Sequence, residues 1–158
     1  MKFIINIILI SLVTAFDQCS KWYVMAILHY NNDRVITLCK YLDIVMVWNP
    51  GISFGMFSVV KNSNMIFSLL SCFIVLVLLY YSLFKLKKSN HSFIVAVIVG
   101  GAFGNLIDRL RFGAVFDFID IHIAHWHWPV FNVADTFIVC GIITLLCNCF
   151  VKVRNDVD

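Results

Sequence analysis

Hydrophobic residues are concentrated in four long runs along the chain, and most polar residues lie in the connections between them. The clearest run, residues 65–84, contains no charged residue and is followed by Lys85, Lys87 and Lys88. Because about 20 apolar residues form a helix long enough to cross the hydrocarbon core of a bilayer, we predict a membrane-spanning helix here. The lysine-rich segment at about 85–91 is the predicted loop after it.

Two further runs lie toward the C-terminus. Residues 130–151 contain a single charged residue, Asp135, and predict another spanning helix. Residues 92–107 would form a helix of about 24 Å, which is short for a crossing. We therefore predict that this helix extends over residues 92–109.

The N-terminal run, residues 3–16, resembles the start of a secretory signal peptide because Lys2 precedes it, but no small-x-small cleavage site follows. As a helix this run would be about 21 Å long, which is too short to cross a bilayer alone. We therefore predict one helix at about 3–28, which places Asp17 and Lys21 inside the membrane.

The two longer connections, at about 29–64 and 110–129, contain different kinds of residue. Residues 35–48 are rich in β-branched and aromatic residues and precede the turn sequence Asn49-Pro50-Gly51, so we predict a small sheet on the membrane surface. The second connection mixes aspartates with histidines and tryptophans, which suit the lipid–water interface. We expect it to form a loop at the bilayer edge.

The composition agrees with a membrane protein, since 61% of the residues are apolar, against roughly 45–50% in soluble domains. We predict an all-α integral membrane protein with four transmembrane helices and a small β-rich extracytoplasmic element between the first two, in a single domain at 1–158. The twelve Lys and Arg residues form no basic stripe, so no nucleic-acid partner is expected. The six cysteines include no CxxC pair, and we predict no structural disulfide.

Charge distribution predicts the orientation of the helices. Four spans place both termini and the lysine-rich loop on the same side, and the positive-inside rule assigns that side to the cytoplasm. Most of the acidic residues close to the helices then gather near the outer face, at Asp108, Asp117, Asp120 and Asp135.

Asp117 and Asp135 are the strongest candidates for chemistry. Each lies in apolar sequence without a basic residue within four positions, although an ionised aspartate in hydrocarbon costs about 2.5 kcal/mol or more. If the fold brings them together, burial and repulsion would leave one proton shared between them. Such a pair hydrolyses peptides, but helix-capping aspartates or a proton or ion relay would show the same pattern.

The other polar residues near the spans favour supporting roles. Asp17 and Lys21 have the spacing of an ion pair on one helix face, although a role at a substrate is an equal alternative. Asn105, Asp108 and Arg109 share one face at the predicted outer end of their helix and are typical of a structural polar cap.

Three histidines, His122, His125 and His127, lie close to Asp117 and Asp120 in the sequence. Histidine and carboxylate side chains are common zinc ligands, but this spacing matches none of the usual helical metal motifs. Because the histidines alternate with tryptophans, we expect them in headgroup water and predict no metal.

Four separated blocks together resemble the bacterial lipoprotein signal peptidase family, also called signal peptidase II. They are Asp17-Gln18-Cys19-Ser20-Lys21, Asn49-Pro50-Gly51-Ile52-Ser53-Phe54-Gly55, Gly100-Gly101-Ala102-Phe103-Gly104-Asn105-Leu106-Ile107-Asp108-Arg109, and Val115-Phe116-Asp117-Phe118 with Phe131-Asn132-Val133-Ala134-Asp135. Each block alone is weak, but their order and separation over residues 17–135 make the resemblance specific.

The resemblance implies a four-helix aspartyl endopeptidase that removes signal peptides from diacylglyceryl-modified prolipoproteins in the bacterial inner membrane. It implies that Asp117 and Asp135 are the catalytic pair. It also implies a binding and supporting set, namely Asn49, Gly51, Asn105, Asp108, Arg109, Asn132, Asp17 and Lys21. It implies neither metal nor cofactor; the expected partners are prolipoproteins and membrane lipids, and the expected state is a monomer.

Two other classes of function remain open. A small transporter component that couples to protons or ions would also carry intramembrane aspartates, though closer to the bilayer midplane. A non-catalytic anchor or assembly factor would not require two unpaired acids at helix ends. The gathering of acids at one face beside a large loop favours chemistry at the membrane surface.

Overall fold

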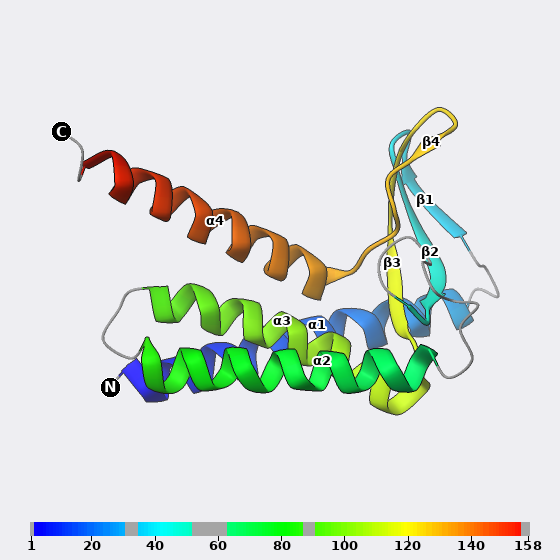
Figure 1. Cartoon of the computed structure of the whole chain (residues 1–158). Helices are drawn as coiled ribbons and strands as arrows, with labels where there is room; N and C mark the ends of the chain where they lie inside the picture. Colours follow the sequence, from blue (N-terminus) through cyan, green and yellow to red (C-terminus); the bar gives the residue numbers. More distant parts are fainter. Residues whose placement is uncertain (1, 31–34, 52–62, 87–90, 156–158) are drawn as a thin grey trace.

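The computed structural model describes residues 2–30, 35–51, 63–86 and 91–155. Figure 1 shows long helices running side by side and a small sheet standing at one end of them. In chain order the elements are α1 (Lys2–Tyr30), β1 (Val35–Cys39), β2 (Leu42–Asn49), α2 (Ser63–Tyr80), the π-helix η2 (Tyr81–Lys85), α3 (His91–Phe112), β3 (Val115–Ile123), β4 (Trp126–His127) and α4 (Val133–Asn155).

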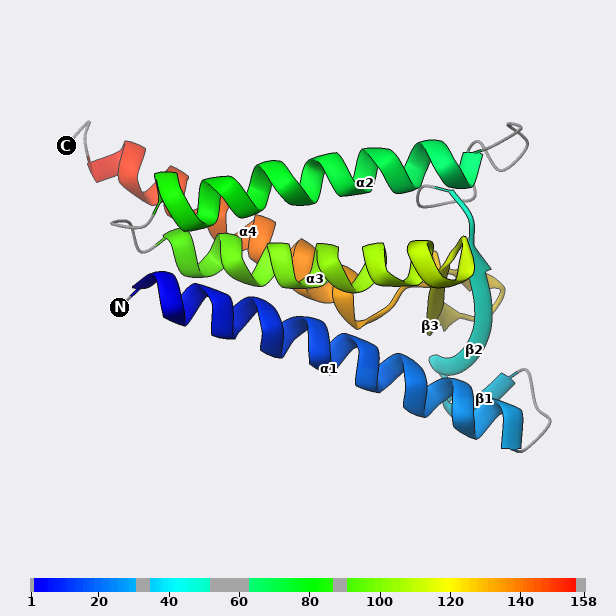
Figure 2. The same ribbon diagram turned by 90° about the horizontal axis from the view of Figure 1, so that it is seen from below.

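Helix α3 is the centre of the bundle. It lies between α1 and α2 (Figure 2) and also contacts α4. Ile10 of α1 packs with Val95, Ala96 and Val99 of α3 in a buried cluster. The first turn of α1 and the last turns of α4 lie at the end of the bundle away from the sheet (Figure 1).

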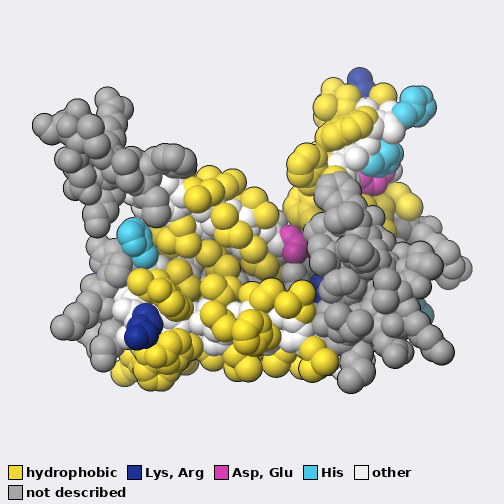
Figure 3. Space-filling view, in the orientation of Figure 1, with side chains coloured by type: hydrophobic (Ala, Val, Ile, Leu, Met, Phe, Trp, Pro, Cys, Tyr) yellow, Lys and Arg dark blue, Asp and Glu magenta, His cyan; other side chains and the backbone are white. Residues whose placement is uncertain are grey.

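The outer surface of the bundle is apolar. Leu69, Phe73 and Leu76 of α2 are 62%, 65% and 57% exposed, and hydrophobic side chains cover the visible face of the bundle in Figure 3. Soluble monomers rarely expose apolar patches of this extent. This surface therefore suits contact with lipid.

Three of the described helices are long and apolar enough to cross a membrane. These spans are Lys2–Tyr30, Ser68–Lys85 and His91–Phe112, while the apolar stretch Val133–Asn148 of α4 is shorter. The bounds of α1 and α3 lie close to the predicted 3–28 and 92–109. The predicted helix at 65–84 is divided, because its last turn takes up the π-helical form of η2. Four crossings remain a prediction.

Glycines allow α3 to approach its neighbours. A Cβ atom added at Gly100 would lie 2.7 Å from the Cβ atom of Val13 in α1. At Gly101 it would lie 2.6 Å from the backbone oxygen of Ala134 in α4. Since real Cβ atoms do not approach other atoms so closely, larger residues here would push α1 or α4 away from α3.

The sheet is antiparallel, in the order β1-β2-β3-β4. Strands β1 and β2 form from the strand-rich segment between the first two helices. Strands β3 and β4 come from residues 110–129, where we expected a loop, so that expectation is wrong. The alternating sequence of β3 pairs with β2, with Trp48 opposite Phe116, and a distant partner strand of this kind is not visible in local sequence.

The sheet is fixed to the bundle by packing against α1. Leu28 of α1 is buried with Phe116 and Phe118 of β3. Helix α4 begins at Val133, later than the predicted start at 130, because Phe131 pairs with Ile119 of β3. The ends of α1, α3 and α4 and the strands β2 and β3 therefore meet in one region.

Candidate active site

Asp117 lies in β3 and is 2% exposed. Its Oδ1 atom accepts a hydrogen bond of 2.7 Å from Nδ2 of Asn132, just before α4. Its Oδ2 atom accepts one of 3.0 Å from Nδ2 of Asn49, the last residue of β2. Two asparagines from separate segments therefore hold both oxygens of a buried carboxylate.

Asp135 lies in the first turn of α4. Its Oδ1 atom accepts a hydrogen bond of 2.8 Å from Nδ2 of Asn105, and its Oδ2 atom accepts one of 3.3 Å from the backbone N–H of Asn132. In return the backbone N–H of Asp135 donates to Oδ1 of Asn132 over 3.0 Å. This reciprocal capping fixes the start of the helix, where its dipole favours a negative charge.

Asn132 and Asn105 connect the two carboxylates. Nδ2 of Asn132, which also donates to Asp117, donates to Oδ1 of Asn105 over 3.0 Å. Nδ2 of Asn105 then donates to Asp135. The order Asp117, Asn132, Asn105, Asp135 is a continuous hydrogen-bonded chain through buried amide groups.

The environment of Asp117 favours its protonated form. Burial raises the pKa of Asp117 to about 6, and the nearby charge of Asp135 acts in the same direction. Hydrogen bonds from Asn49 and Asn132 and the charge of Lys21 oppose that rise. Asp117 therefore keeps a proton at mildly acidic pH, where an ordinary aspartate has lost it.

A buried ion cluster lies beside this chain of amides. Nζ of Lys21 is 2.9 Å from Oδ2 of Asp17, the pairing that their spacing predicts. It is also 2.8 Å from Oδ2 of Asp108 and donates to Oδ1 of Asn105 over 3.0 Å. From their spacing we predicted that Asp108 and Arg109 belong to one polar cap. In the structure Asp108 instead pairs with a lysine of another helix.

Arg109 instead holds the turn after β2. Its guanidinium donates to the backbone oxygen of Gly51 over 3.3 Å and to that of Asn105 over 3.5 Å. The backbone N–H of Gly51 in turn donates to Oδ1 of Asn49 over 3.1 Å. Arg109 thus fixes the segment that presents Asn49 to Asp117.

Gln18 is a site residue that no spacing pattern in the local sequence singles out. Its Nε2 atom donates to Oδ2 of Asp17, to Oδ1 of Asp108 and to the backbone oxygen of Gly104, over 3.2, 2.9 and 3.1 Å respectively. An amide beside Asp17 in an otherwise apolar helix was the available signal, because a polar group there needs partners.

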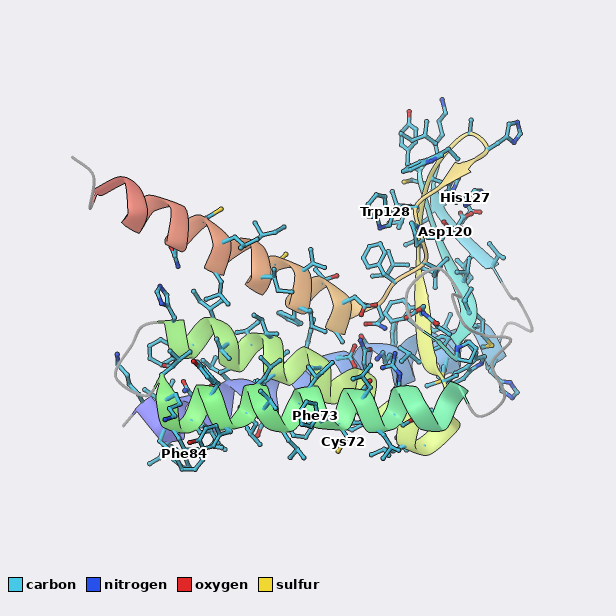
Figure 4. The ribbon with its side chains drawn as sticks, viewed as in Figure 1. Cys72, Phe73, Phe84, Asp120, His127 and Trp128 are labelled. Carbon is cyan, nitrogen blue, oxygen red and sulfur yellow. The ribbon has the colours of Figure 1, made fainter. Side chains whose placement is uncertain are left out.

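Two cavities meet at Asp117. A cavity of about 530 Å³ has a polar floor of Asn49, Asn105, Arg109, Asp117 and Asp135 and apolar walls that include Ile138 and Val139 of α4. A second, of about 580 Å³, shares Asn49 and Asp117 and is lined by Trp48, Trp126 and Trp128. Trp128 borders both cavities, and Figure 4 shows it projecting from the sheet toward the side on which α4 lies.

The histidines lie on the outer part of the sheet. Nδ1 of His127 is 2.9 Å from Oδ2 of Asp120, and Nε2 of His122 is 3.3 Å from Oδ2 of Asp43. His125 lies exposed in the turn between β3 and β4. Within the described ranges, no group of three or more His, Cys or Asp side chains is arranged to hold a metal ion.

A bundle of apolar helices with two linked carboxylates on the floor of a largely apolar cavity defines a membrane protein with an enzyme-like site. The family model described as signal peptidase (SPase) II matches residues 9–151. The lipoprotein signal peptidase of Anaplasma phagocytophilum (strain HZ) is 49% identical over 145 residues, covering 92% of this chain and 91% of that protein. The chain therefore belongs to the signal peptidase II family.

A more distant relative supports the same family, and two solved structures share the fold. The lipoprotein signal peptidase of Pelagibacter ubique (strain HTCC1062) is 37% identical over 146 residues, covering 92% of this chain and 87% of that protein. A bacterial membrane enzyme solved by the in meso method at 2.3 Å superimposes with a TM-score of 0.76 at 24% identity, covering 95% and 90% of the two chains. Another, solved at 1.9 Å, gives a TM-score of 0.74 at 25% identity, covering 91% of each. The family predicted from the four sequence blocks is confirmed.

Proposed function

We propose that this chain is an aspartyl endopeptidase of the membrane that cleaves the signal peptide from diacylglyceryl-modified prolipoproteins. Family membership supports the peptidase activity and the substrate class. The observation that carries the two-aspartate mechanism is the hydrogen-bonded chain that joins Asp117 to Asp135 through Asn132 and Asn105 at the floor of one cavity.

In the proposed mechanism the two carboxyl groups have different protonation states. Asp117, with its pKa raised to about 6 by burial and by Asp135, holds the proton and donates a hydrogen bond to the scissile carbonyl oxygen. Asp135 lies at the start of α4, where the helix dipole favours its ionised form, and takes a proton from the attacking water.

The water oxygen then bonds to the carbonyl carbon, and Asp117 passes its proton to the carbonyl oxygen, which gives a neutral tetrahedral diol. In the second step Asp135 returns its proton to the amide nitrogen. Asp117 recovers the proton of one diol hydroxyl as the carbon–nitrogen bond breaks. One water is consumed, and the pair returns to its starting state with one shared proton.

The surrounding residues suit a peptide delivered in the plane of the membrane. Ile138 and Val139 give the first cavity an apolar wall on the side of α4. A substrate anchored by acyl chains would therefore reach the carboxylates along an apolar path. In this proposal the turn of Asn49 and Gly51, held by Arg109 of α3, borders the reacting peptide bond.

The distribution of Lys and Arg residues predicts how the protein lies in the membrane. Four helices cross the bacterial inner membrane, both termini are cytoplasmic, and the site lies near the outer face. The protein acts as a monomer, with prolipoproteins and membrane lipids as its partners.

The decisive experiment measures cleavage of a diacylglyceryl-modified and an unmodified precursor by purified protein in detergent. We expect the wild type to cleave the modified precursor, and Asp117→Asn and Asp135→Asn to lose at least about a thousandfold in kcat. Asp43→Asn, a sheet variant outside both cavities, is the matched control and should retain activity. Normal turnover by either site variant would contradict the mechanism, and cleavage of neither precursor by the wild type would contradict the function.

A further inference from the structure

The buried cluster of Lys21, Asp17 and Asp108 makes further contacts besides its two ion pairs. Asp17 and Asp108 each accept a hydrogen bond from a backbone N–H of another segment. Oδ1 of Asp17 accepts from Ala134 over 2.9 Å, and Oδ2 of Asp108 accepts from Phe116 over 3.1 Å. Both donor residues are fully buried, at 0% exposure.

These two donors occupy equivalent positions relative to the site. Ala134 directly precedes Asp135, and Phe116 directly precedes Asp117. A carboxylate bound to the N–H of a residue limits the rotation of the peptide unit that ends at that residue, one residue before the proposed catalytic aspartate. Asp17 therefore limits the position of the Asp135 backbone, and Asp108 limits that of the Asp117 backbone.

Lys21 joins the two contacts. It is 1% exposed, and its Nζ atom lies within 3 Å of both carboxylates, at 2.9 and 2.8 Å. Because an ammonium group can only donate, its 3.0 Å bond to Asn105 also fixes the Oδ1 atom of that amide toward the lysine. Nδ2 of Asn105 is then directed to Asp135.

We infer that Lys21, Asp17 and Asp108, joined by Gln18, are positioning residues that hold the two proposed catalytic aspartates through the backbone of the residue before each. This inference rests on the proposed function. None of the four belongs to the described residues that line either cavity, so they act through Ala134, Phe116 and Asn105 and not on the substrate.

Stability alone does not account for this cluster. Buried ion pairs are often no more stabilising than apolar residues of similar volume, because desolvation offsets their attraction. The cluster instead fixes the orientation of three donor groups, in a region where α1, α3, α4 and β3 meet. These donors are the backbone N–H groups of Ala134 and Phe116 and the Nδ2 atom of Asn105. Catalysis depends on such placement, since small displacements of reacting groups lower the rate strongly.

The first test does not depend on activity. Amide hydrogen exchange in detergent should show the N–H of Phe116 exchanging at least about tenfold faster in Asp108→Ala, with the N–H of Ala134 little changed. Asp17→Ala should give the opposite result. If both amides accelerate equally in each variant, the bundle has merely loosened, and the inference of separate contacts is wrong.

The second test uses the precursor cleavage assay. Asp17→Ala and Asp108→Ala should lower kcat by at least about tenfold with a much smaller change in KM, because the cavity lining is intact. Ser92→Ala, a buried polar residue of α3 outside the site, should change thermal stability without this loss of kcat. Unchanged kcat in well-folded Asp17 and Asp108 variants would overturn the inference.

Conservative variants separate the two contacts further. In Asp108→Asn one oxygen can still face Lys21 and Phe116, and the new NH₂ group meets only the amide of Gln18, so part of the activity should return. In Asp17→Asn the side-chain oxygen accepts from the N–H of Ala134, and the NH₂ group then faces Lys21. Because both of these groups are donors, the recovery of activity should be smaller. Equal recovery by both would contradict the proposed geometry. The amide-exchange test needs no substrate. It can therefore support or contradict the positioning inference even if the proposed function is wrong.

Discussion

At the scale of single residues, Asp117 is an acidic side chain whose buried position disfavours its charged form. It is nearly fully buried, and two asparagines donate hydrogen bonds to it. These bonds do not fully offset the loss of hydration, so the pKa of Asp117 stays raised at about 6. A residue of this kind costs stability at neutral pH and is retained where chemistry requires it.

This setting predicts how stability depends on pH. Between the ordinary aspartate pKa of 3.8 and about 6, the folded protein binds more protons at Asp117 than the unfolded chain does. The stability due to this proton is therefore complete below about pH 4 and is lost as the pH rises through 6. Thermal unfolding in detergent between pH 4 and 7 should show a smaller decline for Asp117→Asn than for the wild type.

The size of that difference is on the order of 2–3 kcal/mol for a shift of this extent. Ser92→Ala, which changes a buried polar residue of α3 but no titratable group, serves as the control and should keep the decline seen in the wild type. Parallel pH curves for wild type and Asp117→Asn would show that the Asp117 carboxyl group is not perturbed by burial.

Residue by residue, the sequence found part of the site. Asp117 and Asp135 stood out because lipid penalises acids that have no basic neighbour. The partners of Asp117 could not be found in this way, since Asn49 and Asn132 lie in distant segments. Asp108 was grouped with Arg109 from spacing on one helix, although its closest basic partner, Lys21, belongs to α1.

At the scale of elements, the start of α4 depends on its contact with α3. A Cβ atom at Gly101 would lie 2.6 Å from the backbone oxygen of Ala134, which is part of the same turn as Asp135. A Cβ atom at Gly141, further along the same helix pair, would lie 2.5 Å from Cγ1 of Ile98, so the conflict there is with a side chain of α3 and not with the turn that carries Asp135.

Gly101→Ala should therefore destabilise the protein by about 1–3 kcal/mol and lower kcat, because α4 must shift at the turn that carries Asp135. Gly141→Ala is the matched control in the same interface, and it should also destabilise the protein but leave kcat close to the wild-type value, because its conflict lies away from the turn of Asp135. Thermal unfolding and precursor cleavage measure both effects. A larger loss of kcat in Gly141→Ala would mean that the start of α4 is not the sensitive contact.

The strands show why elements differ in how far local sequence predicts them. The segment between the first two helices was recognisable from its β-branched and aromatic residues and its turn. Strand β3 also alternates, but its aspartates and histidines suggested an interfacial loop. Its extended form depends on pairing with β2 and on packing of Phe116 and Phe118 against Leu28, and tertiary contacts of this kind override local preference.

At the scale of the whole molecule, the orientation in the membrane is a testable prediction. Cys39, in β1, is exposed, and the predicted topology places it outside the cytoplasm. In a variant that keeps Cys39 alone, a membrane-impermeant maleimide added to intact spheroplasts should label it. A variant with Lys2→Cys as its single cysteine should be labelled after lysis only. The reverse pattern would invert the topology.

The sequence by itself determined the membrane class, the approximate helices, the family and the two unpaired aspartates. These follow from local properties: the length of apolar runs, the cost of a charge in lipid, and motifs within short blocks. The tertiary structure decided which groups meet. It joined Asp117 to Asp135 through Asn132 and Asn105 and placed Lys21 between Asp17 and Asp108. Hydrogen bonds and ion pairs act over about 3 Å, and the folded chain alone brings residues from four segments within that distance.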